Sequence, residues 1–537
     1  PFNETELNRV KNLIQNQSDS VLSNAAALGG RLSDYYVSYQ GDWSQYFTDL
    51  ENVKKLKLAD VNQTLTQFLV PQHRISGDIQ PTPEEQKKAL KQKQAAEPAK
   101  TLTQTDLQAE PLKDSRVYQQ EVAEYVKASK QSLVNTEKKI QRGTLKNGIQ
   151  YALYPTSTRD DKTYATISID FGTEKSLFNQ GEALDLMAYL LLRGSDQYSL
   201  QDIADKSIEA GGGATANAAG NSITIQIVAK KEKFADYFKF MLEVLKKPKF
   251  EPSQFDLIKS QSLSALDRPY TEPETVAALT MTRLLETYQP GDLRYHFEPE
   301  FSKQQIKAAT VEQVKTLYQN FFVSNHAQIA ITGDYQAKTM LKILQKEFGG
   351  WKAQLPYQRL SSDYQAYPAQ KVHTLSEQRE FGNYQSILTF PVGADHPDTP
   401  ALMVFSYILG DSQLSSRLAQ ELREKNALVY GFSSGLNLDE WLDSGALTIE
   451  ANYTAGKSAQ VSQGVYKVLN DLLSKGVTEQ ELEAAKANIL KRRVTALEDE
   501  RNIHRMLTPQ LEHHRDLLFR EKRDQALAKL TKADVDA

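Results

Sequence analysis

The most informative stretch of this sequence is residues 410–436, which read GDSQLSSRLAQELREKNALVYGFSSGL. It continues a predicted helix that ends at Lys425 and Asn426, and a strand begins a few residues later. Arg423 and Tyr430 therefore lie on different elements, from which both side chains can converge on one cleft. On the residues alone, a surface ion pair for Arg423 and a half-buried strand position for Tyr430 remain the alternative.

Strands and helices alternate around this stretch without a regular βαβ rhythm. Residues 164–171 (YATISIDF) and 222–229 (SITIQIVA) alternate apolar and polar side chains, which is typical of half-buried strands. Residues 182–193 form a strongly apolar helix that Gly194 closes. Further strands are expected at 327–334, 384–391 and 445–453, and further helices at 231–247, 252–287, 398–425, 457–475 and 478–500. This mixture predicts an α+β fold.

Internal repeats indicate how the chain is organised. Residues 53–73 match residues 306–326 at one offset of 253, which aligns two valines, a phenylalanine and a histidine. Two shorter pairs match at offsets of 475 and 474, namely 6–11 with 481–486 and 56–61 with 530–535. Generic amphipathic helices are the alternative explanation. We expect a chain that starts inside one unit, spans a second and stops inside a third.

The expected boundaries follow from these repeats and from composition. Residues 80–140 are rich in Lys, Gln, Glu, Ala and Pro, which predicts a solvated linker with a helix over 117–136. The other segments are 1–79, the end of one unit; 141–351, a complete unit; 352–372, a connector; and 373–537, a unit truncated at its C-terminus. The start at Pro1 is interpreted as a truncation or processing point.

Composition excludes several classes of function. The net charge of −4 over 537 residues argues against nucleic acid as a main partner. No apolar run approaches the length of a membrane span. The chain has no cysteine, so disulfides, thiolate zinc sites and cysteine nucleophiles are excluded together. Its composition is otherwise that of an ordinary globular protein.

Several stretches resemble one family, the pitrilysin-type (insulinase-type) zinc peptidases. Residues 410–436 are the most specific match, and LKNGIQYALYP (145–155), GEALDLMAYLLLRGS (181–195) and TEQELEAAKANIL (478–490) add to it. The resemblance covers nearly all of the chain except 80–140. It implies repeated two-layer units, each a mostly antiparallel sheet packed with helices. It also implies that a first unit, which carries the zinc motif in this family, precedes this chain, so that 1–79, 141–351 and 373–537 belong to units two, three and four.

The resemblance further implies that no zinc binds within this chain. The family's H-x-x-E-H motif places two histidines and a glutamate on one helix. The corresponding positions here are Asp185, Ala188 and Tyr189, which cannot make that site. The eight histidines form no substitute motif, and the adjacent pair His513 and His514 is interpreted as a solvated polar patch.

In the family, an arginine and a tyrosine seven residues apart contact substrate beside the zinc, and Arg423 and Tyr430 match this spacing. The resemblance therefore implies a zinc metalloendopeptidase that cleaves peptides or unfolded polypeptide in an enclosed chamber. This chain alone is expected to be inactive without the N-terminal half of the same protein. The alternative is a non-catalytic homologue that serves as a structural or partner subunit. A periplasmic location is expected, with the cytoplasm as the alternative.

One further segment is glycine-rich. Residues 209–227 read EAGGGATANAAGNSITIQI, and no G-K-[ST] follows, so the segment is not a phosphate loop. The family has a Gly-Gly turn into an edge strand at this point. We expect a structural turn here, with contact to a peptide in the chamber wall as the alternative.

Overall fold

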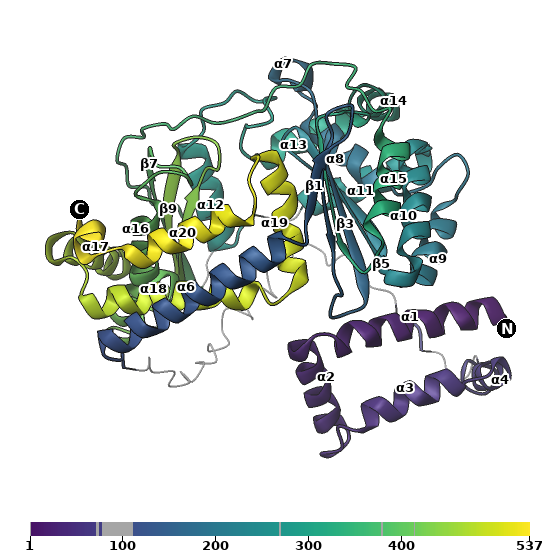
Figure 1. The fold of residues 1–537 in the computed structure, drawn as a ribbon, viewed down its shortest axis with the longest axis horizontal. Coiled ribbons are helices and arrows are strands. Elements are labelled where there is room, and N and C mark those ends of the chain that lie inside the picture. Colours follow the sequence, from purple (N-terminus) through teal and green to yellow (C-terminus); the bar gives the residue numbers. More distant parts are fainter. Residues whose placement is uncertain (1, 71–74, 78–110, 268–269, 377–379, 413) are drawn as a thin grey trace. The chain divides into compact units, whose positions relative to one another are not determined.

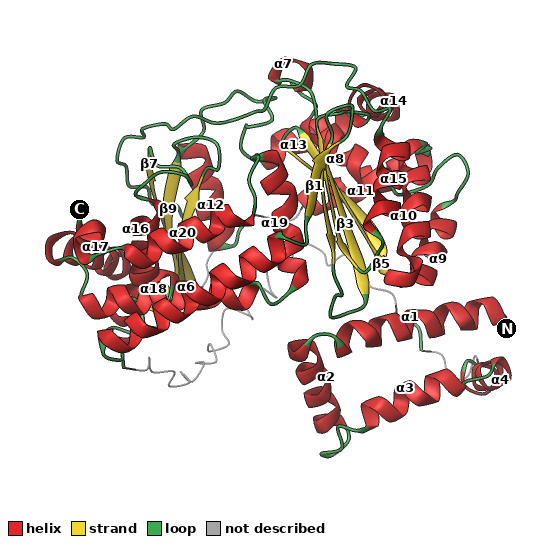
Figure 2. Cartoon of the chain, in the orientation of Figure 1, coloured by secondary structure: helices red, strands yellow, loops and turns green. Residues whose placement is uncertain are grey.

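The computed structural model describes residues 2–70, 75–77, 111–267, 270–376, 380–412 and 414–537. The chain forms two compact units, residues 1–107 and 108–537. The Lys-rich, Gln-rich and Pro-rich part of the expected linker lies mostly outside the described residues, at 78–110. Figure 2 shows the mixture of helices and strands that makes the second unit an α+β fold, as the sequence predicts.

The first unit is helical. It consists of α1 (Glu4–Leu22), α2 (Ala25–Ser38), α3 (Gln45–Lys55) and α4 (Leu58–Phe68). Asn3 begins α1 with a capping box, because its side chain accepts from the backbone of Glu6 and the Glu6 carboxylate accepts from the backbone of Asn3. Asn24 caps α2 through the backbone N–H of Ala27 at 3.0 Å.

The second unit is built on a six-stranded mixed sheet, called sheet A. Its strands are β1 (Gln141–Thr144), β2 (Gln150–Pro155), β3 (Lys162–Asp170), β4 (Gly213–Ala219), β5 (Ser222–Lys230) and β6 (Ala327–Gly333). Their order is β1-β2-β6-β3-β5-β4. Only β2 and β6 pair in parallel, and every other pairing is antiparallel. Strand β6 therefore lies between β2 and β3, although it follows both by more than a hundred residues in the sequence.

Sheet A is buried on both faces, and β6 shows this most clearly. All of its residues are buried. Ile329 and Ile331 face the larger apolar core, while Ala330 belongs to a separate core on the opposite face. In β2, Leu153 likewise faces the larger core and Tyr154 the other. Successive strand side chains point to opposite faces, so two separate layers must cover this sheet.

The larger core lies under helices that come from the same part of the chain as the strands. Leu184 and Met187 of α8, Phe238 of α10 and Leu344 of α15 are buried there. The helices of this region are α7 (Glu174–Leu177), α8 (Gly181–Leu190), α9 (Leu200–Ala210), α10 (Lys231–Lys246), α11 (Pro252–Leu266), α12 (Pro273–Leu284), α13 (Pro299–Ala308), α14 (Val311–Leu317), η2 (Tyr318–Phe322) and α15 (Ala337–Phe348).

A second sheet, called sheet D, organises the C-terminal part. Its strands β7 (Phe381–Phe390), β8 (Val429–Leu438) and β9 (Gly445–Thr454) are antiparallel in the order β7-β9-β8. One face packs on a core that includes Leu447, Ile449 and Ala451 of β9. The helices of this part are α16 (Thr399–Ser406), η3 (Tyr407–Asp411), η4 (Ala419–Lys425), α17 (Ser458–Lys475), α18 (Glu479–Ala496), α19 (Glu500–Glu512), α20 (Leu517–Lys529) and α21 (Lys532–Asp536).

Helix α19 covers the second face of sheet A, although it follows sheet D in the sequence (Figure 1). Ile503, Leu507 and Leu511 are buried in the core of that face. His504 is also buried, and its two ring nitrogens lie 2.9 Å from the hydroxyl of Thr166 and 3.0 Å from that of Thr332. The histidine thus satisfies two hydroxyls that the sheet buries under the helix.

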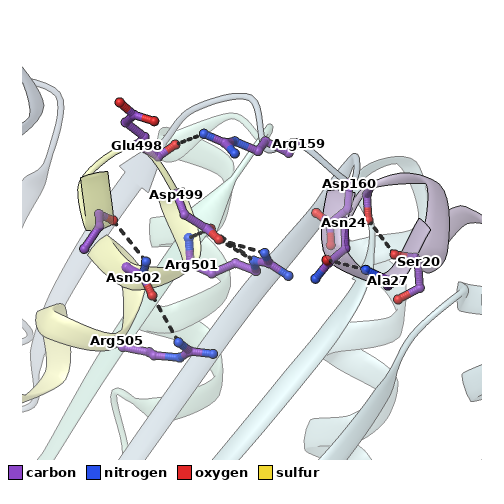
Figure 3. Close-up of polar contacts among 12 residues, drawn as sticks. Ser20, Asn24, Ala27, Arg159, Asp160, Glu498, Asp499, Arg501, Asn502 and Arg505 are labelled. Atoms are coloured by element: carbon purple, nitrogen blue, oxygen red, sulfur yellow. Dashed lines mark hydrogen bonds and ion pairs between the residues drawn. The ribbon is translucent and has the colours of Figure 1, made fainter. Parts of the chain in front are cut away.

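The start of α19 is fixed by polar contacts, which Figure 3 shows. The Asp499 carboxylate accepts from the backbone N–H of Arg501 at 2.9 Å and pairs with the Arg501 guanidinium at 2.7 Å. These contacts hold the pKa of Asp499 below its usual range. Arg159, in the loop between β2 and β3, donates to the backbone carbonyl of Glu498 at 2.6 Å. The first set of contacts caps α19, and the Arg159 contact ties its start to the loop between β2 and β3.

Three details differ from the sequence-based expectation. The single helix predicted over 252–287 is two helices, because Pro273 begins a new helix as its first residue. The helix predicted over 398–425 is interrupted between η3 and η4, where the hydroxyls of Ser412 and Ser415 bond to each other at 2.5 Å. His513 is not part of a solvated patch, since its ring stacks on Trp441 with 4.0 Å between centroids.

The helix expected over 117–136 is α6 (Ser115–Glu137). Its side chains are packed rather than solvated. Tyr118 and Val122 are buried in the core under sheet D, and Leu133 is buried in the core on the second face of sheet A. Ser129 donates to the Asp524 carboxylate of α20 at 2.6 Å. This helix therefore takes part in two cores of the second unit.

The repeat indicated by the sequence extends to sets of four helices. The starts of α1, α2, α3 and α4 precede those of α18, α19, α20 and α21 by 472 to 475 residues. They precede those of α11, α12, α13 and α14 by 248 to 254 residues. The same helical pattern thus occurs three times, once in the first unit and twice in the second.

Replacing the buried Leu507 by alanine tests the packing of α19 on sheet A. Leu507→Ala is expected to lower the free energy of unfolding by about 2–5 kcal/mol, because it leaves a cavity under a fully covered sheet. The matched control is Leu473→Ala on α17, where the side chain is 80% exposed and the expected change is within about 0.5 kcal/mol. Urea unfolding measures both, and equal effects would contradict the packing.

His504 makes stability depend on pH. Burial, with the nearby Arg505, lowers the pKa of His504 to about 4, so the unfolded chain takes up this proton first as pH falls. Stability is therefore lost between about pH 6.5 and pH 4, by roughly 3 kcal/mol from this group. Urea unfolding across this range compares the natural chain with His504→Gln. The loss should be smaller by about that amount in the variant, and identical pH profiles would contradict the assignment.

Candidate functional site

The segment between η4 and β8 is a tight reversal. The Leu428 N–H donates to the carbonyl of Leu422 at 2.8 Å, and the Asn426 amide donates to the carbonyl of Glu421 at 2.6 Å. Ala427 has a φ of +45°, the left-handed conformation that costs a residue with a β-carbon about 1 kcal/mol. This reversal places the end of η4 beside the start of β8. The predicted helix end and strand start both occur here.

Arg423, on the last turn of η4, is half-buried. Its guanidinium makes no hydrogen bond or ion pair with any residue that the structure describes. Glu421, on the same helix, is instead paired with Lys467 at 2.5 Å and with Lys425 at 3.9 Å. The surface ion pair that the residues alone allowed for Arg423 is therefore not formed within the described residues, and its five N–H donors have no protein acceptor there.

Tyr430 is an exposed side chain at an irregularity of β8. The register of β8 on β9 shifts between Val429 and Gly431, and Tyr430 lies at this bulge. Its side chain is 61% exposed, and its phenol oxygen accepts from the hydroxyl of Thr454 at 3.1 Å. No interaction within the described residues joins it to Arg423, so the convergence of the two side chains on one cleft stays a prediction.

The three positions that would carry a zinc motif lie on α8. Asp185 and Tyr189, four residues apart, are exposed on one face of the helix, and Ala188 is buried in the core. Although Asp185 is exposed on the helix, the surrounding protein raises its pKa to about 6, and the Glu182 carboxylate adds to this. A single carboxylate beside a methyl group and a phenol does not fit zinc. Among the described residues, no group of three or more His, Asp or Glu side chains could hold a metal ion.

A cavity of about 270 Å³ lies beside α8, and no sequence pattern predicts it. Glu182 and Asp185 line it from α8, Gly220 from the turn between β4 and β5, and Tyr295 and Phe297 from the loop before α13. Tyr295 and Phe297 lie more than a hundred residues beyond α8 in the sequence, so no local pattern predicts that these segments meet. The cavity is walled by two carboxyl groups with raised pKa and by aromatic rings.

The glycine-rich segment forms the structural turn that was expected. Gly211 ends α9 in a left-handed conformation with a φ of +64°. At Gly212, a β-carbon would lie 1.8 Å from the carbonyl oxygen of Val228, so only glycine allows this approach. The strand that follows, β4, is an edge strand of sheet A.

Comparison with known proteins identifies this fold. Residues 308–489, which include the reversal with Arg423 and Tyr430, match the model of the peptidase M16 inactive domain. This stretch belongs to the M16 (pitrilysin-type) peptidase family. The family resemblance predicted from the sequence is thereby confirmed.

The M16 relatives include proteins named as peptidases and one named as a non-peptidase. An uncharacterized zinc protease of Mycobacterium leprae, ML0855, is 27% identical over 203 residues, which cover 36% of this chain and 43% of that protein. The non-peptidase homolog YmxG of Helicobacter pylori is 23% identical over 250 residues, or 46% of this chain and 55% of YmxG. The chain thus matches about half of the length of these relatives.

A likeness to one solved structure extends over the whole chain. The crystal structure of the periplasmic protease PqqL from Escherichia coli matches 100% of this chain and 59% of PqqL, with a TM-score of 0.60 and 14% identity. At this identity the likeness concerns the fold alone. Within the part of the chain that the structure describes, no helix has the length and apolar character needed to cross a membrane.

Zinc titration tests the geometry of α8. The purified 537-residue chain is expected to show no saturable zinc binding in competition with a zinc indicator, because α8 offers only one ligand. The Asp185→Asn variant should give the same titration curve. Stoichiometric binding that this variant loses would contradict the assignment of α8 as a helix without a metal site.

Proposed function

We propose that this chain is the C-terminal part of a zinc-dependent metalloendopeptidase, which hydrolyses peptides or unfolded polypeptide in an enclosed chamber. In this proposal the chain supplies chamber wall and contacts to the substrate. An N-terminal M16 unit of the same protein holds the zinc, because α8 does not fit it. The protein works in the periplasm, as the name of the structural relative PqqL suggests for that protein.

The proposal depends most on the state of Arg423. A half-buried guanidinium with no partner among the described residues is costly unless a ligand supplies the acceptor. Glu421, two residues before it on the helix, already pairs with two lysines. The free donors of Arg423 are therefore available to an oxygen of a bound peptide.

Tyr430 supplies a second donor at the other end of the same reversal. Its phenol oxygen accepts from Thr454, which leaves the phenol O–H free to donate to a substrate. A carbonyl oxygen gains negative charge as a peptide bond is hydrolysed, and donors held by the protein stabilise that charge. The left-handed Ala427 is consistent with a backbone that is strained to hold these two side chains at one site.

The second candidate is a non-catalytic homologue that acts as a structural or partner subunit. Two observations favour it. The relative YmxG of Helicobacter pylori is named a non-peptidase homolog, and α8 has lost every position of the metal motif. A scaffold has no evident need for an unpaired arginine beside an exposed tyrosine, although a subunit that completes the zinc site of another chain does. The peptidase proposal therefore accounts for more of the features of this chain.

Substitutions at Arg423 and Tyr430 test the proposal in the full-length gene product. Arg423→Ala and Tyr430→Phe are each expected to lower kcat/KM for a fluorogenic peptide by about a hundredfold, because each removes a donor to the developing charge. Arg423→Lys should recover only part of the loss, since lysine lacks the planar fork.

The controls are matched surface substitutions. Arg505→Ala on α19 and Tyr466→Phe on α17 change exposed side chains of the same types and should leave kcat/KM unchanged. Thermal unfolding confirms that each variant is folded. Unchanged peptide cleavage in folded Arg423→Ala and Tyr430→Phe would overturn their assigned role.

A further inference from the structure

The second helix of a four-helix set packs in the same way in both sets of the second unit. Helices α2, α12 and α19 occupy this position in the three sets, and each follows the first helix of its set after a short connection. In the second unit both α12 and α19 leave the sheet that precedes them in sequence and pack on the other one (Figure 1). The two parts of the unit therefore exchange helices.

Helix α19 shows what this position requires. It packs on β2, β3 and β6 of sheet A, on the face that the local helices leave free. Its buried aliphatic residues Ile503, Leu507 and Leu511 recur every four residues along one face. The spacing places all three on the stripe that meets the sheet.

Helix α12 makes the reciprocal contact. It packs on β7 of sheet D, and the Asn452 amide of β9 donates to the Glu274 carboxylate at 2.6 Å. Asn452 lies on the face of sheet D opposite to the core residues Ile449 and Ala451, because strand side chains alternate. In sheets A and D alike, the face opposite the sheet's own larger core is thus covered by a helix from the other part of the unit.

Helix α2 has the same pattern, but its contacts with α1 and α3 in the first unit leave its apolar residues exposed or half-buried. Ile503, Leu507 and Leu511 of α19 correspond, at the offset of 475, to Leu28, Leu32 and Tyr36, and no residue of α2 is buried. Tyr36 is 58% exposed and the adjacent Val37 is 80% exposed. Its fourteen residues, AAALGGRLSDYYVS, include only two charged side chains. A helix of this composition with no buried residue indicates a missing partner.

We propose that α2 is a docking helix that covers the outer face of a third sheet, supplied by an M16 unit that precedes Pro1 in the same polypeptide. Both sheets of the described chain already carry a helix on the equivalent face, so neither is free for α2. PqqL, which matches the whole of this chain, extends over a further part of its own length that this chain does not match. The inference rests on the part of the proposed function that places another M16 unit before this chain.

The residues of α2 define the face that the partner presents. Leu28 and Leu32 are aliphatic, and Gly29 stands where α19 has His504, which bonds to two threonine hydroxyls of sheet A. Glycine offers neither a donor nor an acceptor from its side chain. The partner sheet is therefore expected to be apolar under α2, without the buried hydroxyls that sheet A shows under α19.

Cysteine labelling tests this docking directly, because the chain has no cysteine of its own. Tyr36→Cys places a thiol on the proposed contact face, and the control Asp34→Cys places one on an exposed position half a turn away. In the 537-residue chain the two thiols should react with a maleimide at similar rates. In the full-length gene product the thiol of Tyr36→Cys should react at least about tenfold more slowly than that of Asp34→Cys.

Each other outcome overturns the proposal. Equal rates in the full-length protein would show that α2 stays uncovered. Protection in the 537-residue chain that rises with concentration would assign the face to a second copy. Labelling does not depend on zinc or on catalysis, so the two proposals fail separately: a protected thiol in a protein without zinc contradicts the peptidase proposal alone, and an unprotected thiol in an active peptidase contradicts this one alone.

Discussion

Burial of the second face of sheet A is the constraint on which the rest of the second unit depends. Strand β6 is buried on both sides, and the helices next to it in the sequence cover only one of them. The other side is covered by α19, which lies more than a hundred and sixty residues further along the chain, and by the end of α6. The part built on sheet A therefore needs a helix from the part built on sheet D, and α12 makes the reverse also true. This exchange of helices explains why residues 108–537 form one compact unit.

The same constraint connects the fold to function. Because the two parts exchange helices, the segment with Arg423 and Tyr430 is held in place by parts of the chain that lie far from it in the sequence. The reversal with Arg423 and Tyr430 lies between η4 and β8, and the core beneath them includes Tyr118 and Val122 of α6. Helix α8, on which the resemblance to the family places a metal motif, is a core helix, and its outer face has one carboxylate beside a small cavity. In the proposed function, the donors of Arg423 and Tyr430 contact a substrate that is held beside a metal in another unit.

Much of this could be predicted from the sequence, and the failures have physical reasons. The alternation of Ile167 and Ile169 in β3, the apolar helix α8 and the glycine turn at Gly211 are local patterns, and each was found at its predicted place. The helix over 398–425 is interrupted at a segment where the hydroxyls of Ser412 and Ser415 bond to each other, which helical periodicity does not register. The packing of α6 and α19, the stacking of His513 on Trp441 and the cavity beside Asp185 all arise from contacts between distant segments. A single sequence carries no local signal for such contacts.

The account's central claim is that this chain is the part of an M16 peptidase that lacks the metal. The most direct test is the intact mass of the protein purified from its natural source, measured together with its zinc content. The account predicts a polypeptide heavier than the 60.5 kDa of this chain, with one zinc ion per molecule. A zinc-free protein, whether it is heavier or has the mass of this chain alone, would contradict it.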